Sequence, residues 1–171
     1  SGRLLIRSNL RQANFDLYQL ALDDSAGKPS TRLDPANWQN ILAGDERTYL
    51  TNHLVFREHL FVEARIDGLD QMMVVAQNGE SHLIEMPEES YSLGFGTNAD
   101  YGAKFLRLGY TSMVTPNTVY DYDLETRVLQ QRKVQQVPGG YEAKNFVTRR
   151  LMATARDGTQ VPISLVQRHD T

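Results

Sequence analysis

The stretch that decides the fold is HLFVEARIDGLDQMMVVAQNG, residues 59–79 of the 171-residue chain. Two short apolar runs flank Asp67-Gly68, a dipeptide typical of tight β-hairpin turns. Asn78-Gly79 is a second dipeptide of this kind and leads into another strand-like run, Ser81 to Met86. The stretch therefore predicts three consecutive antiparallel strands.

Strand-like runs recur on both sides of this stretch. They are residues 4–8, 15–22, 49–56, 59–66, 71–76, 81–86, 105–110, 118–123 and 127–131. An apolar, an alternating and a more polar strand follow one another in units spaced by about 45–55 residues, close to the length of a propeller blade. In the first unit the more polar strand is expected near residues 31–33. The pattern predicts a mainly β fold with about two to three blades of a partial β-propeller; the alternative is an irregular β-sandwich.

Helical signals are sparse. Residues 34–42 are a candidate short helix, because Asp34 is a good N-cap and Pro35 suits the first helical position. The competing interpretation is a loop that enters a short strand at Trp38. Residues 87–102 contain four glycines or prolines and are expected to form an irregular connection between strands.

The character of the sequence changes after Gln131. Residues 133–141 are expected to be a linker, because Gly139-Gly140 gives the backbone freedom and Pro138 favours an extended residue before it. A hairpin follows, with arms at 146–156 and 161–167 around Asp157-Gly158. The predicted organisation is residues 1–136 as partial propeller blades and 137–171 as a linker and the first hairpin of a second unit.

Composition excludes several classes of function. With 18 basic and 21 acidic residues the net charge is -3, which argues against nucleic-acid binding. No run approaches the ~18 apolar residues of a membrane span, and the first residues lack a signal-peptide pattern. Cysteine is absent, so disulfides and thiolate chemistry are excluded, as fits a cytoplasmic protein.

The residues that could carry chemistry are few. A metal site would have to use His53 and His59 with Glu58 or Glu63, and solvated or capping histidines, His82 and His169 included, are the favoured interpretation. Gly109 to Met113 resembles a nucleophile elbow but lacks the second glycine, so Ser112 is expected to be a structural hydroxyl.

Three further patterns have simple structural explanations. Gly94, Gly96 and Gly102 do not have the spacing of a phosphate loop, and a flexible connection is expected there. The basic pairs Arg132-Lys133 and Arg149-Arg150 are expected on solvated strand faces. Asp121 and Asp123 lie on one face of a strand, where paired carboxylates can do acid–base work, but exposed edge charges are the default. We therefore predict no catalytic, cofactor-binding or metal-binding residue in this chain.

Several stretches resemble the prolyl oligopeptidase family of serine peptidases, most closely its oligopeptidase B (protease II) branch. Residues 110–123, with their Tyr-x-Ser-x-x-x-Pro pattern, resemble a late blade of the family's propeller. Residues 150–166, with Ala-Arg-Asp-Gly-x-x-Val-Pro, resemble the hairpin where the chain re-enters the peptidase domain, and residues 137–141 resemble the hinge before it. Residues 59–69 also resemble a blade of that branch.

The resemblance implies a cytoplasmic oligopeptidase that hydrolyses short peptides, in this branch after Arg or Lys. A seven-bladed propeller would cover an α/β-hydrolase domain and admit only small peptides. The catalytic Ser, Asp and His would lie beyond Thr171, so this chain alone is expected to be inactive, and His169 is not expected to be the catalytic histidine.

Two expectations compete about how the chain behaves. As a propeller fragment it would pack against the rest of the propeller and the peptidase domain, or associate with itself through uncovered blade edges. As a stand-alone β-domain it would bind a peptide or a carbohydrate through aromatic side chains, several of them in loops: Trp38, Tyr91, Phe95, Tyr101 and Tyr110. The simpler explanation of these aromatics is that they fill gaps between sheets.

Overall fold

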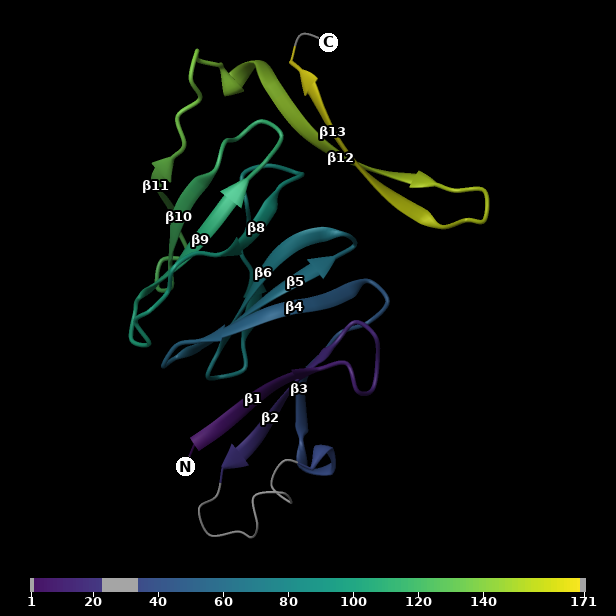
Figure 1. Cartoon of the computed structure of the whole chain (residues 1–171), viewed down its shortest axis with the longest axis vertical. Helices are drawn as coiled ribbons and strands as arrows, with labels where there is room; N and C mark the ends of the chain where they lie inside the picture. Colours follow the sequence, from purple (N-terminus) through teal and green to yellow (C-terminus); the bar gives the residue numbers. More distant parts are fainter. Residues whose placement is uncertain (1, 23–33, 170–171) are drawn as a thin grey trace.

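The computed structural model describes residues 2–22 and 34–169, and the fold is built almost entirely from antiparallel strands (Figure 1). Three sheets follow one another along the chain, and a two-stranded hairpin projects beyond the third. The first sheet has the order β1-β2-β3, the second β4-β5-β6-β7 and the third β8-β9-β10-β11. None of these sheets closes on itself, as a partial propeller requires.

The element bounds follow the predicted strands closely in most places. The first sheet contains β1 (Gly2–Ser8), β2 (Asp16–Leu22), the 3₁₀ turn η1 (Pro35–Asn37) and β3 (Gln39–Ala43). The second contains β4 (Thr48–Val55), β5 (His59–Ile66), β6 (Leu69–Ala76) and β7 (Ser81–Leu83). The third contains β8 (Ser92–Phe95), β9 (Phe105–Thr111), β10 (Thr118–Asp123) and β11 (Leu129–Val134), and the hairpin contains η2 (Ala143–Asn145), β12 (Phe146–Thr154) and β13 (Gln160–Arg168).

The predicted turns form as expected. Asp67 and Gly68 both have positive φ, 50° and 81°, and join Ile66 to its cross-strand partner Leu69. Only glycine adopts such angles without strain, and asparagine or aspartate tolerates them best among other residues. Gly79 and Gly158 have φ of 87° and 88° in the two other hairpin turns. These turns fix the registers of β5-β6, β6-β7 and β12-β13.

Buried apolar side chains pack the three sheets against one another in two clusters. Leu17 of β2 packs with Leu50, Val62 and Ala64 of the second sheet. The opposite face of the second sheet packs on the third, in a larger cluster made of Phe56, Phe61, Met72, Val74, Ile84, Leu106, Leu108, Tyr110, Tyr120 and Tyr122. The second sheet is therefore covered on both faces, which explains why β5 is apolar on both.

Only one face of the third sheet is covered by an apolar cluster of this kind, the face that packs on the second sheet. On its other face Gly94 of β8 lies opposite Gly109 of β9, which in turn lies opposite Val119 of β10. Because the two neighbouring glycines have no side chains, a hollow of about 770 Å³ lies over this part of the sheet. The hairpin also has uncovered apolar surface, because the side chains of Leu151, Met152 and Val161 are about half exposed, at 51%, 49% and 45%.

Strand β8 was not predicted, and of the two interpretations of residues 34–42 the loop that enters a short strand near Trp38 is confirmed over the helix. Strand β3 begins at Gln39, just after Trp38, and the helix is limited to one 3₁₀ turn, although Asp34 does cap it through the N–H of Ala36. Strand β8 lies inside the segment 87–102 that was expected to be irregular. Its edge is held by the second sheet: the Phe95 N–H donates to Glu63 Oε1 at 2.5 Å. The polar strand expected near residues 31–33 lies outside the described residues.

These strands change the repeating unit. The second and third sheets each have four strands, with β4 and β8 preceding the three that the spacing predicted. Strand β11 also continues to Val134, two residues into the predicted linker. In the part of the chain that the structure describes, no helix is long and apolar enough to cross a membrane.

Candidate functional site

The most densely bonded polar site lies between the third sheet and the hairpin and is centred on Glu88. This residue stands in the connection between β7 and β8, and four hydroxyl groups donate to its carboxylate. Ser112 Oγ lies 2.9 and 2.7 Å from its two oxygens, Tyr110 Oη lies 3.1 Å from Oε1, and Thr148 Oγ1 lies 3.0 Å from Oε2. Thr115 Oγ1 is the fourth donor.

Glu88 joins segments that are far apart in sequence. Tyr110 and Ser112 come from the end of β9 and the turn after it, whereas Thr148 comes from β12 and is only 2% exposed. Burial, and then the charge of Glu88, raises the pKa of the Tyr110 hydroxyl, so this hydroxyl remains a donor. The carboxylate is thus an acceptor surrounded by protonated hydroxyls.

The neighbouring residue, Glu89, holds the hairpin from outside. Its Oε1 accepts from Arg149 Nη1 at 2.8 Å, and its Oε2 accepts from the backbone N–H of Arg150 at 3.1 Å. These two donors, the backbone N–H first, lower the pKa of the Glu89 carboxyl. The Arg150 guanidinium donates in turn to the backbone carbonyl of Asp67, in the turn between β5 and β6.

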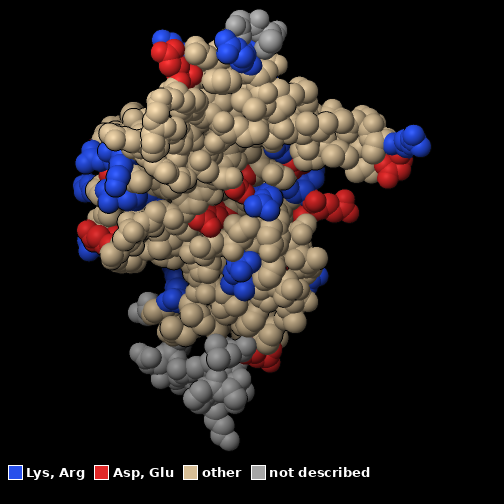
Figure 2. All heavy atoms as spheres, turned by 45° about the horizontal axis from the view of Figure 1, so that its top comes forward, with Lys and Arg blue, Asp and Glu red and all other residues tan. Residues whose placement is uncertain are grey.

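A cleft of about 430 Å³ lies beside these contacts. It is lined by Arg65 and Asp70 of the second sheet, by Tyr91 and Ser112, and by Arg150 and Ser164 of the hairpin. The space-filling view shows acidic and basic groups side by side in the band beneath the projecting hairpin (Figure 2). The junction between sheets and hairpin is therefore polar, unlike the apolar interfaces between the sheets.

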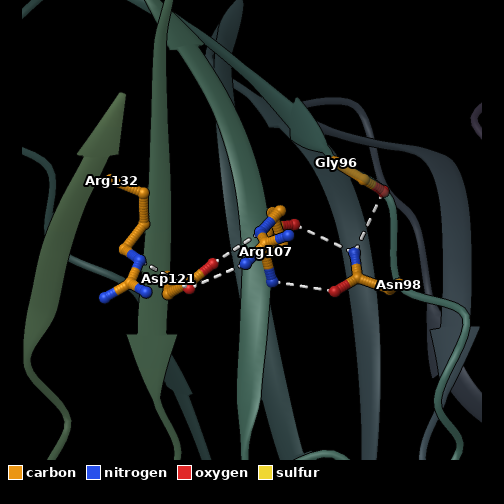
Figure 3. Close-up of polar contacts among 5 residues, drawn as sticks. All are labelled: Gly96, Asn98, Arg107, Asp121 and Arg132. Carbon is orange, nitrogen blue, oxygen red and sulfur yellow. Dashed lines mark hydrogen bonds and ion pairs between the residues drawn. The ribbon is translucent and has the colours of Figure 1, made fainter. Parts of the chain in front are cut away.

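A second polar network lies on the open face of the third sheet (Figure 3). Asp121 of β10 accepts from Arg107 of β9 in bidentate fashion, at 2.7 Å from Nε and 2.9 Å from Nη2. Arg132 Nε of β11 lies 3.2 Å from the same carboxylate. Asn98 completes the network by bonding the backbone N–H and carbonyl of Arg107, at 2.8 and 2.9 Å, and the carbonyl of Gly96.

This network corrects the interpretation of Asp121 as an exposed edge charge. Its side chain is only 8% exposed, and both carboxylate oxygens are paired. The hydrogen bond from Arg107 to Asp121 raises the pKa of that guanidinium. Asp123 has a different task, since its Oδ1 accepts from the N–H groups of Glu125 and Thr126 in the next turn. The two carboxylates therefore bond to separate sets of partners.

The structure places His53 and His59, the two candidates for a metal site, on opposite faces of the second sheet, although His59 lies close enough to His82 to add to the effect of burial in lowering the pKa of His82. His53 lies opposite Val62, on the face of the second sheet that packs on the first, whereas His59 stacks on Phe61 on the other face. His82 Nε2 lies 2.8 Å from Tyr122 Oη. Among the described residues no group of three or more His, Asp or Glu side chains could hold a metal ion.

The remaining candidates have structural roles. The Ser112 hydroxyl bonds on both sides: besides donating to Glu88 it accepts from the N–H groups of Val114 and Thr115. The basic pairs are not simply solvated, because Arg132, Arg149 and Arg150 all have the partners given above. Gly94 lies in β8, so the glycines there do not form the flexible connection that was expected.

Most of the aromatic side chains fill gaps between elements. Tyr110 is buried in the larger core cluster, and Tyr91 and Phe95 pack against it. The Trp38 ring lies 5.6 Å from that of Tyr18. Tyr101 differs from these four, because it is 56% exposed.

Sequence reasoning did not single out Glu88 or Glu89. Both stand in a segment with no strand pattern, and their partners Tyr110, Ser112 and Thr148 lie 22 to 60 residues away. The one signal that could have drawn attention to them is their adjacency, since Glu88 and Glu89 form a pair of carboxylates in a connection that also carries Glu85.

The succession of sheets, connection and hairpin matches a known class of protein. The family model described as "Prolyl oligopeptidase, N-terminal beta-propeller domain" matches residues 1–135. The chain therefore belongs to the prolyl oligopeptidase family and carries part of its N-terminal β-propeller, as the sequence patterns predicted.

Individual relatives agree with this assignment. The chain is 34% identical over 170 residues to dipeptidyl aminopeptidase BI of Pseudoxanthomonas mexicana, which covers 98% of this chain and 22% of the relative. It is 31% identical over 163 residues to protease 2 of Moraxella lacunata, covering 95% and 22%. Oligopeptidase B from Trypanosoma brucei, solved in a closed form with covalently bound antipain, superimposes with a TM-score of 0.76 at 28% identity, covering 99% of this chain and 24% of that one. The chain thus spans about a quarter or less of the length of these relatives.

Proposed function

We propose that this chain is part of a longer serine peptidase similar to oligopeptidase B, which hydrolyses short peptides after Arg or Lys in the cytoplasm. The observation that carries the proposal is the order of the elements: stacked blade-like sheets, an extended connection, then a hairpin. The relatives that share this order over nearly the whole chain are peptidases.

In this proposal residues 1–136 are blades that restrict entry to small peptides, and residues 137–171 are the linker and the first hairpin of the peptidase domain. The conformations of Gly139 and Gly140, with φ of 86° and 74°, support a linker that only glycine fits well. The hollow over Gly94 and Gly109 would then be covered by another part of the propeller, and the exposed apolar residues of the hairpin by the rest of the peptidase domain. Where these partners are missing, the same surfaces would favour self-association.

The test is hydrolysis of a short fluorogenic peptide ending in Arg. The complete polypeptide that the gene encodes should cleave it, and a serine-directed reagent should abolish the cleavage. The 171-residue chain alone should give no turnover, because the proposal assigns none of the catalytic residues to it. Turnover by this chain alone, sensitive to the same reagent, would refute the proposal.

The gene sequence beyond the codon for Thr171 gives an independent test. We expect a Gly-x-Ser-x-Gly motif followed by an Asp and then a His, the order of an α/β-hydrolase. A stop codon shortly after Thr171 would instead favour the alternative, a stand-alone β-domain that binds a peptide or carbohydrate. The exposed Tyr101 is the aromatic side chain that supports this alternative best.

A further inference from the structure

We propose that Glu88 and Thr148 form a releasable clamp that fastens the hairpin to the blades and so sets how readily the two parts separate. Glu88 acts here as a positioning residue and not as a catalytic one. The inference deepens the proposed function, because it assigns a residue to the movement by which a peptide would enter.

The clamp is asymmetric. Three of the four donors to Glu88, namely Tyr110, Ser112 and Thr115, belong to the third sheet and its turn, and only Thr148 belongs to the hairpin. Ser112 is fixed in turn by two backbone N–H groups of that turn. The carboxylate therefore stays in place when the hairpin leaves, and Thr148 docks into a socket that already exists.

The chemistry of the contact favours exchange. Every hydrogen bond to Glu88 among the described residues comes from a neutral hydroxyl, so separating the parts breaks no ion pair at this residue. The Thr148 hydroxyl can donate to water once it is exposed. When docked, Thr148 is almost fully buried, so the closed clamp excludes water from its hydrogen bond.

The contacts around the clamp are equally replaceable. The ion pair between Glu89 and Arg149 joins side chains that are 49% and 48% exposed, and such pairs add little stability. Several large apolar side chains of the hairpin, such as Leu151 and Ile163, are exposed and do not pack into the two core clusters. The hairpin is consequently held by polar contacts that water can replace, with Thr148 as the buried one.

Hydrogen–deuterium exchange tests the clamp directly, on the complete polypeptide that the gene encodes. Thr148→Val keeps the shape of the side chain and removes its donor. We expect the amide hydrogens of residues 146–154 that face the blades and not β13, such as that of Arg150, which donates to Glu89, to exchange about tenfold faster in this variant, the effect of losing one charge-assisted hydrogen bond. Exchange in β5 and β6 should stay unchanged. Glu88→Gln, which removes one acceptor oxygen, should accelerate the same amides.

Two matched variants control the experiment. Thr148→Ser keeps the hydroxyl and should restore slow exchange, and Thr154→Val makes the same substitution at an exposed position of the same strand. If Thr148→Val exchanges no faster in residues 146–154 than Thr154→Val, the clamp is refuted.

A kinetic measurement separates the clamp from the peptidase proposal. In Thr148→Val, kcat/KM should rise for a long Arg-containing peptide relative to a tripeptide, because a looser junction admits the long one more easily. An unchanged ratio together with faster exchange would refute the role in substrate entry. If the unaltered polypeptide cleaves neither peptide, the proposed function fails, and the exchange data still decide on the clamp.

Discussion

Replacement of Asp121 by Asn tests whether the network in Figure 3 stabilises the third sheet. The substitution keeps the size of the side chain and removes its charge, so the bidentate pair with Arg107 and the contact with Arg132 are weakened together. Removing one partner of a fully buried ion pair costs about 3–5 kcal/mol, whereas an exposed pair contributes about 0–1 kcal/mol. Asp121 is 8% exposed, but the guanidinium groups are 36% and 54% exposed and can be rehydrated. We therefore expect a loss of about 2 kcal/mol in the free energy of unfolding, or about 4–8 °C in Tm.

Asp123→Asn is the matched control for this measurement. It makes the same chemical change on the same strand, but an Asn oxygen can still accept from the N–H groups of Glu125 and Thr126, so its effect should stay within about 0.5 kcal/mol. Both variants are compared by urea denaturation followed by far-UV circular dichroism. Equal losses in the two variants would show that the buried network adds nothing beyond the charge of the strand, and the reasoning would fail.

The other predictions concern pH and the turn that touches the hairpin. Burial lowers the pKa values of His53 and His82 in the folded chain from the ordinary 6.5, so the unfolded chain binds protons first and the free energy of unfolding should fall as pH drops below about 6.5. A denaturation series from pH 8 to 5 checks this, and a flat profile between pH 7 and 5.5 would contradict it. Gly68→Ala and Gly79→Ala both place a side chain at positive φ and should each cost about 1 kcal/mol. Gly68→Ala should cost more than Gly79→Ala. The Cβ added at residue 68 would lie 3.3 Å from Pro162 Cγ in the hairpin, whereas the one added at residue 79 meets nothing within 4 Å. Equal losses of stability in urea denaturation would argue against contact between the turn at Gly68 and the hairpin.

Where local signals are strong, the sequence predicts the fold almost to the residue. The bounds of β5 and β10 are those expected, since both strands are continuous strand-like runs bounded by turn residues. The short strand near Trp38 was one of two interpretations that the sequence left open, and β3 confirms it, whereas β8 was missed because it has only four residues. Strand β8 is stabilised by tertiary contacts such as the hydrogen bond from the Phe95 N–H to Glu63. Contacts of this kind cannot be deduced from a short window of sequence.

The candidate site was harder to predict than the fold, because its residues meet only after the strands have paired. The burial of Asp121 follows from its register opposite Arg107, and the register follows from a hairpin whose loop spans several residues. Ser112 could be recognised as structural from the missing glycine, yet its partner Glu88 could not be deduced. Hydrophobic periodicity reports which face of a strand is covered, but it does not report which polar groups meet across two elements.

The two kinds of interface in this chain divide the molecule into parts that move differently. The sheets are joined by the two apolar clusters, in which side chains such as Leu106 and Phe61 are completely buried, and their separation would expose all of that surface to water at once. The hairpin is joined by carboxylates to hydroxyl, guanidinium and amide donors, and each of these bonds can be replaced by one to water. The stacked sheets should therefore behave as one rigid body, and the hairpin should detach from it first, at the junction where Glu88 receives Thr148.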